Sequence, residues 1–362
     1  MKRLGVIGAG QLGQMLGIAA GRLGIAVTFL DPAADPPAAA TGPVISCPFD
    51  DEAGLARLAT CSDVITYEFE NVPVDALAPL TARVPVLPPP NALRYAQDRW
   101  HEKQLFDALK VPVPRFARVD SAADLARAAD TLGLPLVLKT RTLGYDGKGQ
   151  FVIRSAAELG QAWQTLGTVA LIAEQWIDFD CEVSLIGARA ADGHIVTYAL
   201  TENLHRDGML RVSRAPSQNI ALLNSARMYT RSLLEHLEYV GVLALEMFVA
   251  GDRLLANEFA PRVHNSGHWT IEGAVTSQFE NHLRAIFGMP LGDTASIGCA
   301  GMLNLIGSMP DTDTLPKQFP WFLHDYGKSP RPGRKLGHLT VLADDPPTLN
   351  QRLAELEARL AV

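Results

Sequence analysis

The chain has 362 residues, of which 48% are hydrophobic and 20% charged, a composition typical of a globular protein of two or three domains. Its net charge of −7 gives no basic surface for nucleic acid or an anionic membrane, and no uncharged apolar run approaches the roughly 18 residues of a membrane span. The start, MKRLGVIGAGQLG, reaches glycines too early for a secretory signal, and the four cysteines show no CxxC spacing, so we expect a cytoplasmic protein with reduced thiols.

The N-terminal stretch matches a dinucleotide-binding pattern. We expect a strand at residues 3–7, a helix at 14–24 and a second strand at 26–30, which together form a βαβ unit. Between the first strand and the helix, Gly8-Ala9-Gly10-Gln11-Leu12-Gly13 is a formal GxGxxG fingerprint, and Asp31 follows about 20 residues later. Taken alone, this pattern favours an NAD-dependent oxidoreductase. The alternatives are glycines that merely let the helix pack closely on the strand, and a helix N-terminus that holds a different phosphate.

The following segment places polar residues at an edge where ligands bind. Residues 63–68 (DVITYE) are expected to form a buried strand, and Glu70 follows its carboxyl end. Open parallel sheets bind ligands at that edge. Residues 91–109 are expected to form one helix after a proline-rich boundary, because their apolar residues fall near one face. Arg99 lies on this helix, where an arginine is most often solvated.

A glycine-rich loop indicates a second kind of nucleotide site. Strands are expected at residues 134–139 and 151–153, and residues 142–150 between them read TLGYDGKGQ. This is not a Walker loop, because it neither leads into a helix nor carries GK[ST]. A glycine-rich loop between antiparallel strands can fold over phosphates as a lid through its free N–H groups, and Lys139 would reach the same phosphates as a point charge. The alternative is a plain flexible hairpin.

Two further apolar strands are expected at residues 171–177 (LIAEQWI) and 181–186 (CEVSLI). The polar end of the first strand, beside an apolar wall, would suit adenine, and a nearby carboxylate would suit the ribose hydroxyls. Residues 201–208 are expected to form a polar turn, in which His205 is equally compatible with a surface position.

A late hairpin brings two glutamates together. The apolar runs 243–250 and 254–260 are joined by Gly251-Asp252-Arg253, which predicts a β-hairpin with a three-residue loop. Pairing the residues that flank this loop places Glu246 opposite Glu258. Like charges that face each other across an antiparallel pair are destabilising, and a divalent cation such as Mg²⁺ would reverse that sign. The hairpin therefore predicts a metal–nucleotide site, the alternative being two exposed carboxylates on a solvated face.

Two polar clusters remain. Residues 257–270 (NEFAPRVHNSGHWT) hold a mixture of charged and polar groups that a core could not bury unpaired. Residues 331–338 (RPGRKLGH) place three cations before an expected strand at 339–342, which in an acidic chain indicates a phosphate-ester site; the alternative is a solvated basic turn. Residues 351–362 are expected to form an amphipathic closing helix.

The order of these segments resembles the ATP-grasp superfamily: a lysine strand, a glycine lid, the EQWI strand end, a downstream glutamate and paired glutamates on a late hairpin. Within it, the chain is similar to the N5-carboxyaminoimidazole ribonucleotide synthases, the ATP- and bicarbonate-dependent enzymes of bacterial purine synthesis. The resemblance covers nearly the whole chain through GAGQLGQM, KTRTLGYDGKGQ, EVSLIGAR, NLHRDG, NEFAPRVHNSGHWT and RPGRKLGHLT. Leu143 stands where many members carry another glycine.

The resemblance implies an α/β and α+β fold of ATP-grasp architecture. A Rossmann-like pre-ATP-grasp domain would occupy residues 1–95, a central ATP-grasp domain residues 96–290 with its lid subdomain at about 115–175, and a small β-rich domain residues 291–362. The family further implies Mg²⁺ or Mn²⁺, ATP as co-substrate and a homodimer, without NAD, biotin, nucleic acid or membrane.

The resemblance also assigns roles to residues. The ATP-binding residues would be Arg99, Lys139, Gly144, Tyr145, Asp146, Gly147, Lys148, Gly149, Gln150, Glu174, Gln175, Trp176, Ile177, Glu182, His205, Asn257 and Glu258. The ribonucleotide would be bound by Gln11, Glu70, Tyr145, Asn265, Lys328, Arg334 and Lys335. Mg²⁺ would be held by Glu246 and Glu258, and the catalytic residues would be Asp146, Arg262 and His264.

The implied reaction phosphorylates bicarbonate to carboxyphosphate, which positioning and charge neutralisation accelerate. The exocyclic amine of aminoimidazole ribonucleotide then attacks carboxyphosphate, or CO₂ released from it, while Arg262 stabilises the oxygens and Asp146 or His264 takes the proton. The rival hypotheses are another ATP-grasp ligase, an NAD-dependent oxidoreductase, and a non-catalytic nucleotide-binding regulator. Retention of Lys139, Glu246 and Glu258 argues against the regulator.

Overall fold

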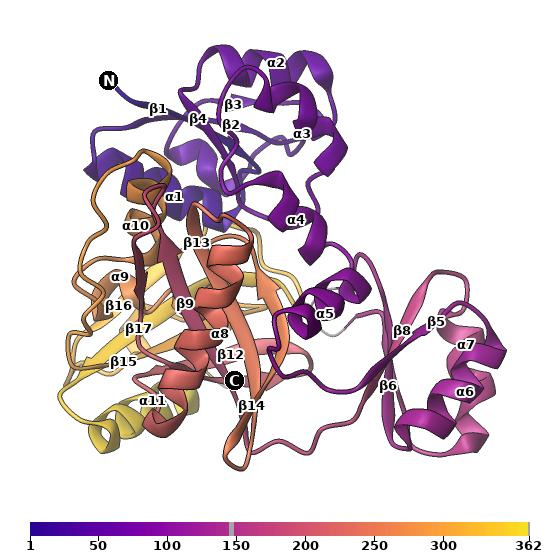
Figure 1. Ribbon diagram of the computed structural model, residues 1–362. Coiled ribbons are helices and arrows are strands. Elements are labelled where there is room, and N and C mark those ends of the chain that lie inside the picture. The colour runs from indigo at the N-terminus through magenta and orange to yellow at the C-terminus, as the bar shows by residue number, and fades with distance from the viewer. Residues whose placement is uncertain (145–147, 361–362) are drawn as a thin grey trace.

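The computed structural model describes residues 1–144 and 148–360, whose strands form three β-sheets surrounded by helices (Figure 1). Tyr145, Asp146 and Gly147 lie outside the described residues, so their predicted roles have no structural counterpart here. None of the described helices combines the length and the apolar character that a membrane span requires.

The N-terminal unit is built on a four-stranded parallel sheet in the order β3-β2-β1-β4, which confirms the predicted βαβ unit. Its core clusters cover both faces of β1, because Val6 packs in one cluster and Ile7 in another, as expected for a parallel strand buried on both sides. The elements are β1 Arg3–Ile7, α1 Gln11–Arg22, β2 Ala26–Leu30, β3 Val44–Ile45, α2 Glu52–Thr60, β4 Val64–Tyr67 and α3 Val74–Thr81.

Two helices connect this unit to the next, where one helix was predicted. They are α4 Pro90–Ala96 and α5 Arg99–Ala108. The prediction of a single helix over residues 91–109 is wrong because the Asp98 side chain accepts a hydrogen bond from the Trp100 N–H at 2.9 Å and so caps a new helix. The break places Arg99 in the first turn of α5.

The second unit is a small antiparallel sheet in the order β5-β8-β6-β7. Helices α6 and α7 cover one of its faces (Figure 1) and share a separate core with it. The strands β6 and β7 pair antiparallel and flank the glycine-rich loop, which confirms that this loop joins two antiparallel strands. The elements are β5 Phe116–Val119, α6 Ala122–Leu132, β6 Leu136–Thr140, β7 Gln150–Ile153, α7 Leu159–Leu166 and β8 Leu171–Gln175.

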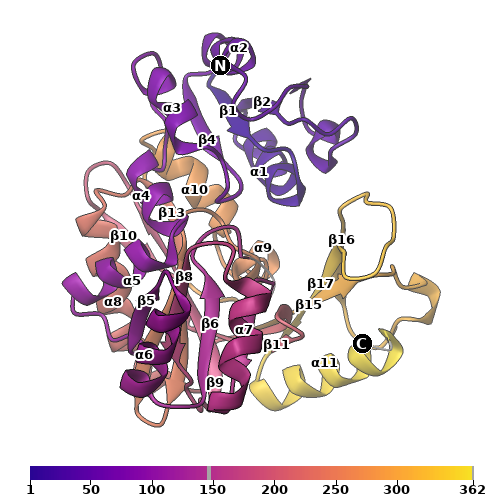
Figure 2. The same cartoon turned by 90° about the vertical axis from the view of Figure 1, so that its right-hand side faces the viewer.

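The third unit is a nine-stranded antiparallel sheet in the order β14-β13-β9-β11-β12-β15-β17-β16, with β10 paired to β9. The strands of the C-terminal segment therefore continue the sheet of the central one. In Figure 2 these strands, β15, β17 and β16, lie right of centre above α11. The elements are β9 Cys181–Arg189, β10 Ile195–Thr197, β11 Thr201–Arg206, β12 Met209–Ala215, α8 Leu223–His236, β13 Gly241–Ala250, β14 Arg253–Ala260, α9 Thr270–Gly273, α10 Gln278–Ile286, β15 Cys299–Ile306, β16 Trp321–Asp325, β17 Lys335–Ala343 and α11 Pro346–Leu360.

Strand β13 lies in the interior of the protein. Val242 and Ala244 pack in the cluster that includes α10, whereas Leu243 and Leu245 pack in the cluster that includes α8. Successive side chains of a strand point to opposite faces, so α8 and α10 cover opposite faces of this part of the sheet. Helix α10 also packs against α1, which seats the N-terminal unit on the large sheet.

Candidate active site

A cavity of about 480 Å³ is lined by residues of all three units, and its size suits a small-molecule site. The described residues predicted for the site line this cavity with two exceptions, Lys328 and Arg334. The predicted residues in its lining are Gln11, Glu70, Arg99, Lys139, Gly144, Lys148, Gly149, Gln150, Glu174, Gln175, Trp176, Ile177, Glu182, His205, Glu246, Asn257, Glu258, Arg262, His264, Asn265 and Lys335.

The hairpin that carries the two glutamates has a shorter turn than predicted. Ala250 pairs with Arg253, so the loop consists of Gly251 and Asp252, and the prediction of a three-residue loop is wrong. Gly251 has a φ of 62°, which suits the first central position of a type II′ turn. Such a turn matches the twist of the two strands and needs no third residue.

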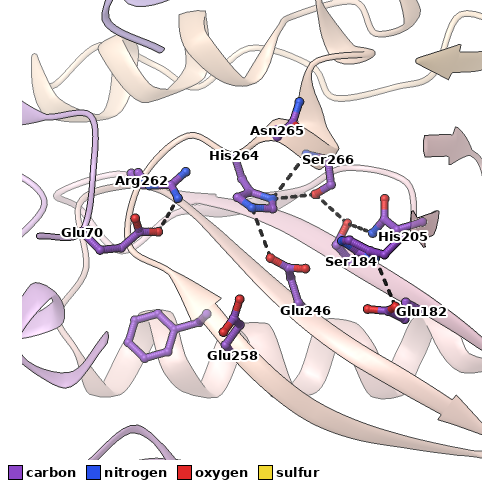
Figure 3. Close-up of polar contacts among 12 residues, drawn as sticks. Glu70, Glu182, Ser184, His205, Glu246, Glu258, Arg262, His264, Asn265 and Ser266 are labelled. Carbon is purple, nitrogen blue, oxygen red and sulfur yellow. Dashed lines mark hydrogen bonds and ion pairs between the residues drawn. The ribbon is translucent and has the colours of Figure 1, made fainter. Parts of the chain in front are cut away.

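A β-bulge restores the predicted pairing of the glutamates. Near the turn, Met247 pairs with Ala256, whereas beyond the bulge Glu246 pairs with Glu258. Asn257 is the extra residue of β14 and has no cross-strand partner. The register therefore confirms that Glu246 lies opposite Glu258, and both side chains lie below Arg262 and His264 in the view of Figure 3.

The two glutamates have different electrostatic surroundings. Burial, together with the negative charge of Glu258, raises the pKa of Glu246 to about 8. Burial also opposes ionisation of Glu258, but the Arg99 guanidinium, 2.7 Å from its Oε2, holds the pKa of Glu258 below its usual value. The pair therefore disfavours two negative charges unless a further cation joins it.

The buried carboxylate of Glu174 lies beside Lys139, the lysine that the sequence predicts to contact the phosphates. Lys139 Nζ donates to Glu174 Oε2 at 3.0 Å, and Lys103 Nζ lies 3.5 Å from the same oxygen. Burial opposes the ionisation of Glu174, but these two ammonium groups outweigh it and lower its pKa to about 2. Sequence reasoning missed Lys103 because a lysine on an amphipathic helix is normally solvated, and no motif marks this one.

The loop after β14 places a guanidinium and an imidazole above the glutamates. Arg262 forms an ion pair with Glu70 of the N-terminal unit and donates from Nη1 to the Val263 carbonyl at 2.8 Å (Figure 3). Arg262 Nε is buried and makes no hydrogen bond within the described part of the chain. His264 Nε2 lies 3.2 Å from Glu246 Oε1. Burial and the Arg262 charge lower the pKa of His264 well below its usual value.

The orientation of His264 is set by a chain of hydroxyl groups and an amide. Its Nδ1 is 2.9 Å from Ser266 Oγ and accepts the Ser266 N–H at 3.3 Å. Ser266 Oγ accepts from Ser184 Oγ (Figure 3). Ser184 Oγ in turn accepts from Asn203 Nδ2. An occupied Nδ1 leaves the proton of the neutral ring on Nε2, facing Glu246.

His205 stands on a strand and not in a turn. The prediction of a polar turn over residues 201–208 is wrong, because β11 extends to Arg206 and only Asp207 and Gly208, both with positive φ, form the turn. His205 Nδ1 lies 3.1 Å from Glu182 Oε1, and although burial opposes protonation, this carboxylate raises the pKa of His205. The structure thus brings two predicted ATP-site residues into contact.

The basic C-terminal segment approaches the N-terminal helix. Lys328 Nζ donates to Gln11 Oε1, and Arg334 Nη1 donates to the Ser329 carbonyl at 3.1 Å. Burial and the charge of Arg334 lower the pKa of Lys328 to about 8. Neither cation lines the cavity, but Lys328 contacts Gln11, which does.

The N–H groups of the GxGxxG segment are already bonded within the chain. The Glu68 carboxylate accepts from the Gly10 and Gly13 N–H groups, and Asp31 accepts from the Ala9 N–H at 2.8 Å. A dinucleotide pyrophosphate needs such groups free at the helix N-terminus. The Glu68 carboxylate occupies the position that the pyrophosphate would need and adds a negative charge there, so this geometry argues against NAD.

Comparisons with known proteins agree along the chain. Residues 1–97 match the ribonucleotide synthetase preATP-grasp domain, residues 104–279 the ATP-grasp domain, and residues 300–352 the phosphoribosylaminoimidazole carboxylase C-terminal domain. The chain is 50% identical to an N5-carboxyaminoimidazole ribonucleotide synthase of Pseudomonas aeruginosa, over 98% of this chain and 99% of the relative. These matches confirm the predicted ATP-grasp architecture and the predicted resemblance.

Solved structures agree with the sequence comparison. The crystal structure of N5-carboxyaminoimidazole ribonucleotide synthetase from Thermus thermophilus superposes with a TM-score of 0.95 at 47% identity and covers 99% of both chains. The synthase from Aspergillus clavatus, in complex with ADP and 5-aminoimidazole ribonucleotide, superposes with a TM-score of 0.92 at 31% identity, covering 99% of this chain and 98% of that one.

Proposed function

Because the chain belongs to the N5-carboxyaminoimidazole ribonucleotide synthase family of ATP-grasp ligases, we propose that it carboxylates the exocyclic amine of 5-aminoimidazole ribonucleotide, using ATP and bicarbonate. One observation carries the proposal. The facing pair Glu246 and Glu258 lies in a cavity that Lys139 lines on the nucleotide side and Arg262 and His264 line on the other. The cavity therefore offers charged groups on both sides of one pair of carboxylates.

In this proposal, ATP lies between the small sheet and the hairpin. Lys139 and the amides of the glycine-rich loop contact the phosphates, and residues 174–177 with Glu182 contact the adenosine. Lys139 is held 3.0 Å from Glu174, so its ammonium group is fixed in place before ATP binds. A point charge held in advance stabilises the charge that develops during phosphoryl transfer at no cost in reorganisation.

The residues around the glutamates fit Mg²⁺. The donor set consists of two facing carboxylates, and the Asn257 amide oxygen beside them is buried with no hydrogen bond within the described residues. Hard cations take such oxygen ligands, and a divalent charge relieves the repulsion by Glu258 that, after burial, raises the pKa of Glu246. We assign Glu246 and Glu258 as its ligands. Bound there, Mg²⁺ would neutralise charge on the phosphates of ATP.

The ribonucleotide, we propose, lies between the N-terminal unit and the large sheet. Its phosphate and ribose contact Gln11, Glu70, Lys328, Arg334 and Lys335. Lys328 and Gln11 are in contact, so a basic group of the C-terminal segment and the first turn of α1 form one surface. This surface adjoins Arg262, which pairs with Glu70.

The chemistry is acyl transfer through carboxyphosphate. A bicarbonate oxygen takes the γ-phosphoryl group of ATP, which releases ADP. The amine nitrogen then forms a bond to the carboxyl carbon as the bond to the phosphate oxygen breaks and phosphate leaves. Arg262, whose Nε is buried and available, stabilises the negative oxygens. Asp146 removes the proton of the amine, or His264 does so once its Nε2 proton has passed to Glu246.

ADP release, measured as a function of aminoimidazole ribonucleotide and bicarbonate, tests the proposal. We expect both compounds to be required for rapid release and the product to be the carboxylated ribonucleotide. Absence of any stimulation by this ribonucleotide would exclude the proposed substrate. Stimulation by glycinamide ribonucleotide in its place would identify another ATP-grasp ligase.

A further inference from the structure

Two neighbouring residues of α5 contact the hairpin on both sides of its bulge. Lys103, fully buried, donates from Nζ to the Asn257 carbonyl at 2.7 Å and lies 3.3 Å from the Ala256 carbonyl. Glu102, 2% exposed, accepts the Phe259 N–H at 2.7 Å. One acidic and one basic side chain thus bond to the backbone of the strand that carries Glu258.

The bulge needs these partners. An extra residue breaks the ladder of hydrogen bonds, and a buried backbone group left without a partner is destabilising. Lys103 supplies a donor to the carbonyl of the bulged Asn257, and Glu102 supplies an acceptor to the Phe259 N–H two residues later. The two bonds bracket Glu258 and stabilise the register in which it faces Glu246.

Through Glu174, Lys103 also links this hairpin to Lys139, the lysine predicted to contact the phosphates. Its Nζ is 3.5 Å from Glu174 Oε2, and that oxygen accepts from Lys139 at 3.0 Å. Burying an ammonium group costs several kcal/mol, and replacing a buried ion pair by apolar residues is often neutral or stabilising. Stability alone therefore gives little reason for a lysine at this place.

We propose that Lys103, assisted by Glu102, is a positioning residue for metal-bound ATP. It does not reach the substrate but acts through the bulge, by holding Asn257 and Glu258 at the cavity wall, and through Glu174, by holding Lys139. This role rests on the proposed function, because it requires Glu258 to be a metal ligand. It adds two residues of α5 to those that prepare the nucleotide site.

The test is the metal dependence of ADP binding, measured by calorimetry with and without Mg²⁺. For Lys103→Met, we expect the gain in ADP affinity on adding Mg²⁺ to shrink by about 10–100-fold relative to the unchanged protein, as for other groups that orient metal ligands. The electron paramagnetic resonance spectrum of Mn²⁺ with ADP should show weaker binding in the same variant. Affinity for the ribonucleotide should stay unchanged.

Two further variants make the result decisive. Glu102→Leu removes the other bond to the bulge and leaves Lys103 beside Glu174, so it should reduce the metal dependence even where Lys103→Met folds poorly. Leu105→Ala, at a buried position of the same helix, loses packing but removes neither hydrogen bond to the bulge and should keep the full metal dependence. The proposal would be overturned if Lys103→Met and Glu102→Leu both showed the same metal dependence of ADP binding as Leu105→Ala.

Failure of this inference is distinguishable from failure of the proposed function. If the unchanged protein bound ADP equally well with and without Mg²⁺, the metal assignment and the positioning role would both be wrong. If ADP binding depended on Mg²⁺ but its release did not respond to aminoimidazole ribonucleotide, the substrate assignment alone would fail.

Discussion

At the scale of single residues, the site depends on charges that are only partly balanced within the protein. Glu258 forms an ion pair with Arg99 at 2.7 Å. Glu246 instead faces Glu258 and His264, and the lowered pKa of His264 keeps that imidazole neutral. The pKa of Glu246, raised to about 8 by burial and by Glu258, shows how unfavourable a second negative charge is here. A cation between the two carboxylates is the arrangement that relieves this cost.

Glu258→Gln tests this view directly. Glutamine keeps the size of the side chain but removes the charge, so we expect turnover of Mg·ATP to fall by at least about 100-fold while the circular dichroism spectrum stays unchanged. The matched control is Glu280→Gln on α10, which breaks an ion pair with Arg284 of similar length, 2.8 Å, outside the cavity. Near-normal turnover in Glu258→Gln would refute the metal assignment.

At the scale of elements, the sequence predicted the strands better than the connections between them. Apolar periodicity predicted the strands at residues 3–7 and 26–30 to the residue, because burial on both faces leaves little freedom in such runs. The prediction of a single helix over residues 91–109 was wrong, because Asp98 caps a new helix within this run of apolar positions. A capping side chain starts a new helix at a single residue, and the spacing of apolar residues does not reveal such a cap.

The late hairpin shows how a correct pairing can follow from an incorrect turn. The predicted loop was one residue too long, and the bulge at Asn257 added one residue to β14, so the two differences cancelled at Glu246 and Glu258. A bulge is held by tertiary contacts, here those of Glu102 and Lys103 from α5. No local pattern of the strand itself encodes those contacts, and for the same reason the sequence did not identify the two α5 residues.

Helix α1 illustrates a motif whose groups serve the fold. Its N-terminal amides at Gly10 and Gly13 bond to the Glu68 carboxylate, which comes from the end of β4. A carboxylate at this position also interacts favourably with the helix dipole. Two interpretations of the GxGxxG pattern placed a phosphate at this helix N-terminus, whereas the structure places a carboxylate side chain of the same chain there.

Glu68→Ala should convert this internal contact into an anion site. Removing the carboxylate leaves the buried N–H of Gly13 and the part-buried N–H of Gly10 without this partner, so we expect the free energy of unfolding to fall by about 2 kcal/mol in a buffer without oxyanions. Inorganic phosphate should bind at the vacated helix N-terminus and restore part of that loss. Thermal unfolding at increasing phosphate concentration measures both effects, with the unchanged protein as control; equal response of the two proteins would contradict the prediction.

At the scale of the whole molecule, the cavity exists because three sheets converge on it. Gln11 comes from the first turn of α1 and Glu70 from the segment after β4 in the N-terminal unit, whereas Lys139 and Glu174 come from the small antiparallel sheet and Glu246 from the large one. Each unit has a core cluster of its own, and a further cluster joins the N-terminal unit to the large sheet, so the geometry of the site depends on the contacts between units. Charged contacts such as the Arg262–Glu70 ion pair cross these boundaries, but so do neutral ones.

The buried contact of His282 joins the N-terminal unit to the large sheet. On α10, its Nδ1 accepts the Val242 N–H of β13 at 3.2 Å, and its Nε2 lies 2.9 Å from Thr66 Oγ1 of β4. Burial alone lowers the pKa of this imidazole to about 3. A neutral ring can bond to both neighbours, with Nδ1 as acceptor and Nε2 as donor, whereas a protonated ring would lose the bond to Val242.

The depressed pKa of His282 makes the stability of the protein depend on pH. In the unfolded chain His282 has a pKa near 6.5, so below about pH 6.5 the unfolded state binds a proton that the folded state does not. The stabilisation is present above that pH and is lost as the pH falls. From pH 7 to pH 5 we expect this one residue to remove about 2 kcal/mol from the free energy of unfolding.

Urea unfolding of the unchanged protein and of His282→Gln at the two pH values measures this contribution. The variant should be less stable at pH 7, because it disturbs the contacts with Val242 and Thr66, but it should lose less stability on acidification by about 2 kcal/mol. The other buried histidines, His264, His268 and His338, are common to both proteins and cancel in the difference. Equal losses in the two proteins would show that His282 binds a proton in the folded state and that its contact does not hold the two units together through a neutral ring.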